Sequence, residues 1–94
     1  MIKNLINGQW VESKETFETV NPATGEVLAE VAHASPEQVA AAVAAAKDAF
    51  PAWANMPVAK RSKIIERLGD LIAENVEELS ILETKDTGLP IYQT

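Results

Sequence analysis

The sequence contains no cysteine among its 94 residues. That absence excludes disulfide bonds, thiolate metal ligands and a cysteine nucleophile within these residues. It fits a cytoplasmic protein, which is the location we predict. The first ten residues, MIKNLINGQW, also lack the long apolar core of a secretory signal peptide.

Positive charge is scarce. Eight Lys and Arg residues stand against 14 Asp and Glu residues, giving a formal net charge of -6. Nucleic-acid binding requires clustered Lys and Arg, so the balance argues against it, and no segment has the pattern of a basic membrane-surface helix. The most apolar run, residues 39–46, is too short and too rich in alanine to span a bilayer. We therefore predict no nucleic-acid partner and no membrane partner.

Glycine and histidine are also rare. The four glycines are isolated from one another, so the sequence has no glycine-rich loop for binding phosphate. His33 is the only histidine, and its place between a predicted strand and a helix cap is typical of a surface residue. No spacing of Ser and Asp residues points to a catalytic triad with it, although triads are assembled in space and not in sequence.

The first third of the chain predicts four short strands, near residues 4–7, 9–11, 16–20 and 26–32. Asn7 and Gly8 supply the two positive φ angles of a tight type I′ hairpin turn. Residues 21–25, NPATG, predict a second turn, because proline fixes one φ angle and glycine frees another. Two-stranded hairpins are not stable alone, so another part of the protein must cover them.

The first predicted helix covers residues 35–50. Ser35 can cap it, Pro36 suits the first helical position, and Gln38 completes a capping box. We expect Pro51 to end or kink this helix, with Trp53 packing just beyond it.

Two further helices are predicted near residues 57–74 and 76–87, because apolar residues recur there at spacings of three and four. Asn75 and Glu78 have the spacing of a capping box, which indicates a new helix at that point. Gly88 is a natural left-handed stop, and Pro90 favours the start of a further helix after it. The apolar positions form a stripe whose ordinary interpretation is a packing face: Ile64, Ile65, Leu68, Leu71, Ile72, Val76, Leu79 and Leu82.

Two acidic features near residue 86 have weak functional interpretations. Asp86, Thr87 and Gly88 spell the tripeptide of aspartic proteases, but that chemistry needs two such carboxylates after apolar strands, and here a single copy follows a helix. Glu83 and Asp86 lie three residues apart and could hold a cation, although a solvated acidic face is the commoner explanation. The residues alone therefore predict an α/β fold without a catalytic constellation.

Several short segments, in their order and spacing, resemble the N-terminal part of the aldehyde dehydrogenase family. The resemblance runs from Leu5 to Thr94, and residues 50–55 with 86–94 are most similar to a semialdehyde-oxidising branch that acts in the catabolism of aromatic compounds. The segments that carry it are INGQWV at 6–11, VNPATGEV at 20–27, residues 49–50 with Trp53, residues 67–68 with 70–72, and LETKDTG at 82–88.

The family resemblance implies an NAD- or NADP-dependent oxidation of an aldehyde to an acid, in which a cysteine attacks the aldehyde, a hydride passes to the nicotinamide and a glutamate activates water. None of those groups matches a residue of this sequence. Residues 1–94, with strands within 4–32 and helices within 35–88, are thus expected to be the N-terminal part of a cofactor-binding domain, truncated before the catalytic parts. The parent enzyme is expected to be a homo-oligomer. Alone, the fragment is expected to be inactive and to bind no nucleotide tightly.

Many family members also hold a structural monovalent cation near this segment. The matching ligands are the backbone carbonyl of Val20 and the carboxylate of Asp86, with a third ligand outside the sequence. The alternative to a fragment is a free-standing α/β interaction module without catalysis. Exposed apolar area distinguishes the two, because only a fragment should leave faces of its helices and hairpins uncovered for the remainder of the enzyme or for self-association.

Overall fold

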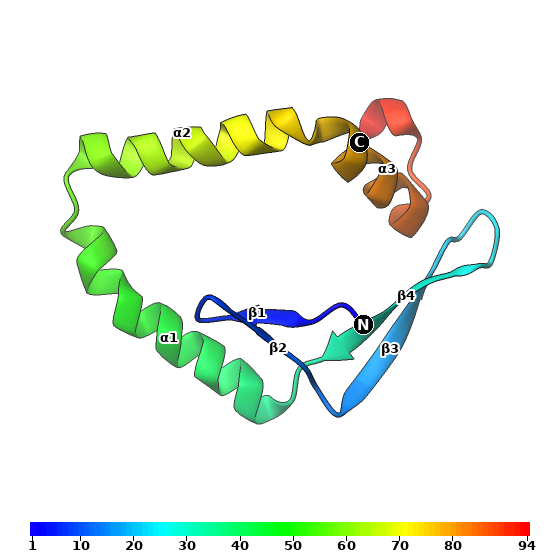
Figure 1. The fold of residues 1–94 in the computed structure, drawn as a ribbon, viewed down its shortest axis with the longest axis horizontal. Helices are drawn as coiled ribbons and strands as arrows, with labels where there is room; N and C mark the ends of the chain where they lie inside the picture. Colours follow the sequence, from blue (N-terminus) through cyan, green and yellow to red (C-terminus); the bar gives the residue numbers. More distant parts are fainter.

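The computed structural model describes residues 1–94 and contains two β-hairpins followed by three helices (Figure 1). This is the α/β order that the sequence predicts. The elements are β1 (Asn4–Ile6), β2 (Gln9–Val11), β3 (Glu15–Val20), β4 (Val27–His33), α1 (Pro36–Ala54), α2 (Val58–Glu74), α3 (Val76–Thr87) and the short 3₁₀ helix η1 (Ile91–Gln93).

Each hairpin forms around the turn that its residues predict. β1 pairs antiparallel with β2 across Asn7 and Gly8, whose φ angles are 51° and 75°. β3 pairs antiparallel with β4, with an irregular register between Thr19 and Val20. The last strand begins and ends one residue later than predicted, because the pairing extends to His33 opposite Glu15.

The N-terminus joins the second hairpin. The amide of Ile2 donates to the carbonyl of Glu30 at 2.7 Å, and the amide of Ala32 donates to the carbonyl of Ile2 at 2.8 Å. Ile2 therefore forms a parallel bridge beside β4, opposite Val31. This bridge gives β4 a neighbour on both sides, and Ala32 is the only buried residue of the chain, with 4% of its surface exposed.

The start of α1 matches the prediction, but its end does not. The Ser35 hydroxyl accepts from the Gln38 amide and the Gln38 side chain accepts from the Ser35 amide, which completes the predicted capping box. The predicted end of the helix at residue 50 is wrong, because α1 continues through Pro51 to Ala54. Proline lacks an N–H and so removes a single hydrogen bond near the end of the helix. The carbonyl of Pro51 still accepts from the Asn55 amide at 3.0 Å, so the last turn closes.

α2 and α3 are separate helices, as predicted, but the predicted cap between them is wrong. Asn75 makes no side-chain cap to α3. The side-chain nitrogen of Asn75 instead donates to the backbone carbonyl of Leu71 at 2.8 Å, which stabilises the end of α2. Gly88 ends α3 with a left-handed φ of 80°, as predicted, and η1 follows Pro90.

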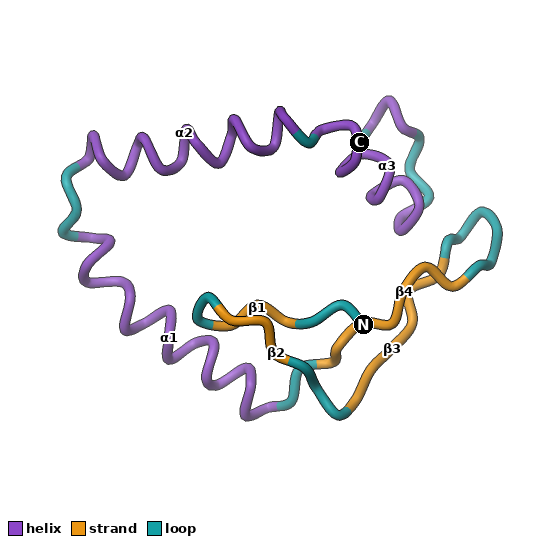
Figure 2. Tube along the Cα trace, viewed as in Figure 1, coloured by secondary structure: helices purple, strands orange, loops and turns teal.

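The elements form an open, flat ring. In Figure 1 the helices form one arc of the ring and the hairpins form the other. Figure 2 shows the same division by secondary structure, with helices and strands in separate parts of the ring. The molecule measures 48 × 35 × 16 Å, and its radius of gyration is 16.9 Å. A compact chain of this length would have a radius of gyration of about 12 Å. The ring therefore has no hydrophobic core between its helices and its strands.

The accessible surface leads to the same conclusion. It amounts to 7475 Å², whereas a compact monomer of this mass would expose about 5,300 Å². Large apolar side chains remain exposed on every element, from Leu5 and Trp10 on the first hairpin to Leu79 and Leu82 on α3. The chain thus leaves uncovered the faces that the sequence predicts to be packing faces.

Candidate functional site

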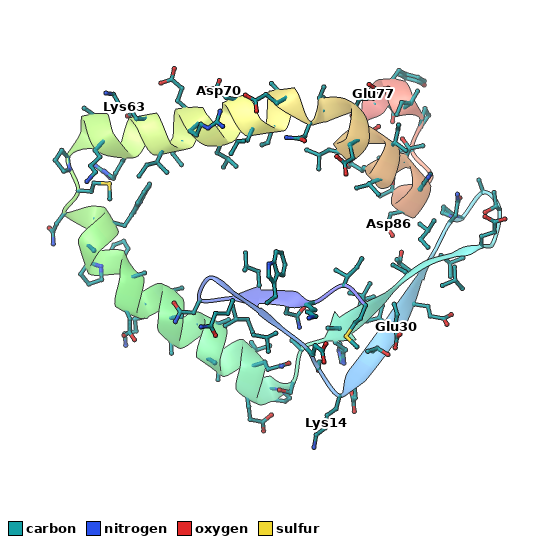
Figure 3. All side chains as sticks on the ribbon, viewed as in Figure 1. Lys14, Glu30, Lys63, Asp70, Glu77 and Asp86 are labelled. Carbon is teal, nitrogen blue, oxygen red and sulfur yellow. The ribbon has the colours of Figure 1, made fainter.

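The two residues of the predicted cation site lie at the place where the ring closes. Val20 is the last residue of β3, and Asp86 is the last but one of α3. The Thr19 hydroxyl donates to a carboxylate oxygen of Asp86, so the carboxylate lies beside the end of β3 (Figure 3). Thr19 is 67 residues away from Asp86 in the sequence. The structure therefore brings Asp86 next to the neighbour of Val20.

Close packing between Gly88 and Pro22 supports the same junction. A Cβ atom built on Gly88 would lie 2.9 Å from the Cγ atom of Pro22, so only glycine fits there without movement. Pro22 is the second residue after β3, and Gly88 is the first residue after α3. The turn after β3 and the end of α3 are thus in van der Waals contact, and this contact helps to hold Asp86 near Thr19.

The chemistry of this junction suits a hard cation, but its protein ligands are few. Carboxylate and carbonyl oxygens are the ligands that such cations prefer. Asp86 forms no salt bridge with a Lys or Arg side chain. No group of three or more His, Cys, Asp or Glu residues gathers anywhere in the chain. The carbonyl of Val20 and the carboxylate of Asp86 are thus ligand types that suit such a cation, and the site itself stays a prediction.

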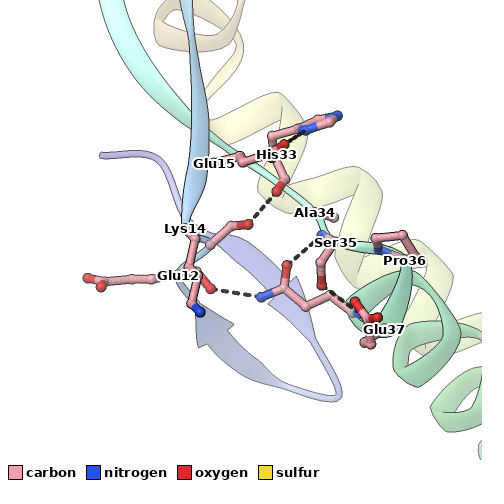
Figure 4. Close-up of a pocket in the computed structure, with 10 residues that line it drawn as sticks. Glu12, Lys14, Glu15, His33, Ala34, Ser35, Pro36 and Glu37 are labelled. Atoms are coloured by element: carbon pink, nitrogen blue, oxygen red, sulfur yellow. Dashed lines mark hydrogen bonds and ion pairs between the residues drawn. The ribbon is translucent and has the colours of Figure 1, made fainter.

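A polar hollow of about 530 Å³ lies where the loop after β2 meets the start of α1 (Figure 4). Gln38 joins the two segments, because its side-chain nitrogen donates to the carbonyl of Glu12 at 2.8 Å. His33 lies 3.3 Å from a carboxylate oxygen of Glu15, and both side chains are largely exposed. The Ser13 hydroxyl donates to the backbone carbonyl of His33 and not to its ring. The hollow therefore holds no activated nucleophile, and His33 is a surface residue, as predicted.

The glycines of the chain form no phosphate-binding loop. Gly8, Gly25 and Gly88 each have a positive φ at a separate turn, and Gly69 lies inside α2. None of them forms a loop of successive amides that could surround phosphate groups. No helix of the structure is both long enough and apolar enough to cross a membrane.

Sequence reasoning missed the partners of Asp86. Nothing in the local pattern around Thr19 or Pro22 indicates contact with α3, because both residues lie in an ordinary strand end and turn. Gly88 carried a signal for a left-handed stop but none for its close approach to Pro22. The resemblance alone singled out Val20 and Asp86 together.

Comparisons with known proteins agree on one family. The family model described as "Aldehyde dehydrogenase family" matches residues 10–94. The chain is 53% identical over 93 residues to 5-carboxymethyl-2-hydroxymuconate semialdehyde dehydrogenase of Escherichia coli. The match covers 99% of the chain and 20% of that relative. The chain is also 51% identical over 89 residues to malonate-semialdehyde dehydrogenase of Lacticaseibacillus casei. This match covers 93% of the chain and 18% of that relative.

Solved structures show the same likeness. An aldehyde dehydrogenase from Bacillus cereus, solved as its NAD+ complex, superposes with a TM-score of 0.91 at 48% identity. The match covers 97% of the chain and 19% of that structure. The chain thus spans about a fifth of the length of the relatives that it matches.

Proposed function

Because the chain belongs to the aldehyde dehydrogenase family, we propose that its 94 residues are the N-terminal part of the cofactor-binding domain of an enzyme that oxidises an aldehyde to an acid with NAD or NADP. The observation that carries the proposal is the 53% identity to a semialdehyde dehydrogenase over 93 of the 94 residues. NAD or NADP supplies the acceptor for the hydride. In this proposal the nucleotide site and the catalytic groups are formed by other residues of the enzyme.

In this proposal the chain contributes scaffold surface and not chemistry. Its hairpins and helices leave their apolar faces exposed, as a segment does when the rest of a larger enzyme covers it. A free-standing interaction module would instead be expected to cover most of its own apolar surface, so the observed exposure favours the first hypothesis. The partner is then the remainder of the enzyme chain, and the enzyme is a homo-oligomer.

The proposed substrate is a semialdehyde. Both named relatives are semialdehyde dehydrogenases, and the more similar of the two acts on 5-carboxymethyl-2-hydroxymuconate semialdehyde. We take that compound, and with it the catabolism of aromatic compounds, as the first choice. The lack of cysteine accords with a cytoplasmic enzyme.

A monovalent cation at the junction of β3 and α3 is the second part of the proposal. The backbone carbonyl of Val20 and the carboxylate of Asp86 would contribute two ligands, and a third would come from another part of the enzyme. The support for it is the Thr19–Asp86 hydrogen bond, which holds the carboxylate beside the strand end. The role is structural, because a cation there would tie α3 to the second hairpin.

The experiment is a substrate comparison on the enzyme that carries these residues. Reduction of NAD and of NADP is followed with 5-carboxymethyl-2-hydroxymuconate semialdehyde, malonate semialdehyde and an unsubstituted aliphatic aldehyde. We expect the highest kcat/KM with the first compound. Preference for malonate semialdehyde would contradict the substrate and leave the reaction class intact. No cofactor reduction with any aldehyde would overturn the proposed function.

A further inference from the structure

The tip of the first hairpin contains the only asparagine of the chain that is followed by glycine. Asn7 and Gly8 join β1 to β2, and both residues are exposed. The backbone nitrogen of the residue after an asparagine can attack the side-chain carbonyl carbon, and glycine places no side chain beside that nitrogen. Every other asparagine is followed by a residue that hinders this attack or has no N–H, namely Leu5, Pro22, Met56 and Val76.

The backbone of the turn already has one of the two dihedral angles that the attack requires. Asn7 and Gly8 have φ angles of 51° and 75°, which are those of a type I′ turn. That turn holds ψ of its first central residue at about +30°, which directs the Gly8 nitrogen away from the Asn7 side chain. A type II′ turn keeps the same positive φ but has ψ of about −120°, which brings the nitrogen alongside the side chain.

A flip of the peptide plane between Asn7 and Gly8 converts the first turn type into the second. Both types close two-residue hairpins, so β1 stays paired with β2. Glycine accepts the change of its φ from positive to negative. Neither the Asn7 carbonyl nor the Gly8 amide forms a hydrogen bond within the chain, and a Cβ atom on Gly8 would meet nothing within 4 Å. The turn therefore reaches the reactive geometry while the hairpin remains folded.

We propose that Asn7 is a site of spontaneous deamidation in the folded protein, with water as the only co-reactant. The Gly8 nitrogen loses its proton to the solvent and forms a bond to Cγ of Asn7. The Cγ–Nδ2 bond breaks, and Nδ2 takes up a proton from the solvent and leaves as ammonia. Water then opens the cyclic imide at one of its two carbonyl carbons. Position 7 becomes aspartate or isoaspartate, and no oxidation or reduction takes place.

The two products differ in their effect on the hairpin. Aspartate adds a negative charge but keeps the backbone length, and it tolerates a left-handed turn as asparagine does. Isoaspartate carries the main chain through the former side chain, which adds one methylene group to a two-residue turn. Turn length fixes the register that places Leu5 opposite Trp10. Isoaspartate should therefore loosen the first hairpin, which also contacts α1, whereas aspartate should not.

The test is peptide mapping by mass spectrometry on the complete enzyme that carries these residues, sampled during incubation at mildly alkaline pH. We expect the imide and isoaspartate to form at Asn7 about tenfold or more faster than any deamidation at Asn21, Asn55 or Asn75. Asn21 and Asn75 are internal references, because their side chains have hydrogen-bond partners within the chain. The same enzyme denatured in urea serves as the positive control for the reaction at Asn7.

Gly8→Asn is the matched variant. Asparagine also tolerates a left-handed turn, but it places a side chain beside the attacking nitrogen. This variant should deamidate at Asn7 about tenfold more slowly than the unaltered enzyme. Asn7→Asp separates the added charge from the altered backbone. Its Tm should equal that of fresh enzyme, whereas enzyme enriched in isoaspartate by ion exchange should have a lower Tm.

The proposal is overturned if Asn7 stays unmodified in the native enzyme while the denatured enzyme reacts there, which would show that the rest of the enzyme immobilises the turn. It is also overturned if the other asparagines react as fast as Asn7, or if Gly8→Asn reacts as fast as the unaltered enzyme. An equal Tm for the isoaspartate form would refute the loosening of the hairpin. None of these measurements depends on aldehyde oxidation, so they stand apart from the proposed function.

Discussion

Replacing Gly88 with alanine separates two physical costs at the junction that closes the ring. The residue has φ +80°, and an added Cβ would lie 2.9 Å from the Cγ atom of Pro22. A left-handed conformation costs an alanine about 1–2 kcal/mol. Extra atoms in a filled space cost about 1–3 kcal/mol more. Gly25→Ala is the matched control, because Gly25 has φ +77° and nothing within 4 Å of the added atom. It should incur the first cost alone.

Amide hydrogen exchange followed by NMR measures both costs locally. The amide of residue 88 donates to the Thr84 carbonyl at 2.9 Å, and the Asn21 amide donates to the Glu26 carbonyl at 2.9 Å. Corrected for intrinsic rates, exchange at residue 88 should accelerate by about thirtyfold or more in Gly88→Ala, up to complete loss of protection. Exchange at Asn21 should accelerate by about five- to thirtyfold in Gly25→Ala.

Pro22→Ala completes a double-mutant cycle, because it removes the Cγ atom that the new Cβ would meet. In that background Gly88→Ala should cost only as much as Gly25→Ala does. The difference between the two backgrounds is the coupling between residues 22 and 88. If Gly88→Ala accelerates exchange no more than Gly25→Ala does, or if Pro22→Ala leaves its effect unchanged, the end of α3 does not pack on the second hairpin.

Three further predictions concern the helix cap, the cation and the chemistry. Ser35→Ala should destabilise the start of α1 by about 1 kcal/mol and so accelerate exchange of the Gln38 amide about fivefold, whereas Ser62→Ala in the exposed middle of α2 should not. In the enzyme that carries this chain, Asp86→Ala should abolish the rise in Tm produced by sodium or potassium over tetramethylammonium; an unchanged rise, equal to that of an Asp70→Ala control, would contradict the cation site. The purified 94-residue chain should reduce no cofactor with a semialdehyde, because it has no thiol to attack the aldehyde; reduction above background in a contaminant-free sample would refute this.

The elements that sequence reasoning located well are those whose ends are decided by neighbouring residues. Asn7 and Gly8 set the first hairpin by their own φ angles, and Ser35 with Gln38 sets the start of α1 by two hydrogen bonds over three residues. Pro51 misled because the cost of a proline depends on how much helix follows it, and here only one turn follows. Asn75 misled because its side chain had two acceptable partners and bonded backward to Leu71.

The junction of β3 and α3 was beyond local reasoning. Thr19 and Asp86 meet only because three helices carry the chain around the ring and back to the first third of the sequence. No hydrophobic periodicity or capping pattern in the sequence predicts this contact between α3 and β3. The likeness to a family located Asp86, and the contacts of Asp86 with Thr19 and of Gly88 with Pro22 give that position a physical setting.

Because the ring is flat and open, the chain has almost no buried interior. In most proteins a leucine in the middle of a helix stabilises its own molecule, and truncating it to alanine costs about 2–5 kcal/mol. Leu68, more than half exposed, has little to lose in the separate chain, and its truncation would be felt only after another surface has covered it. Selection can therefore preserve such a residue only through the assembled state. The apolar side chains along α2 are therefore determined by the surface that packs against them, and they contribute little to the stability of this segment alone.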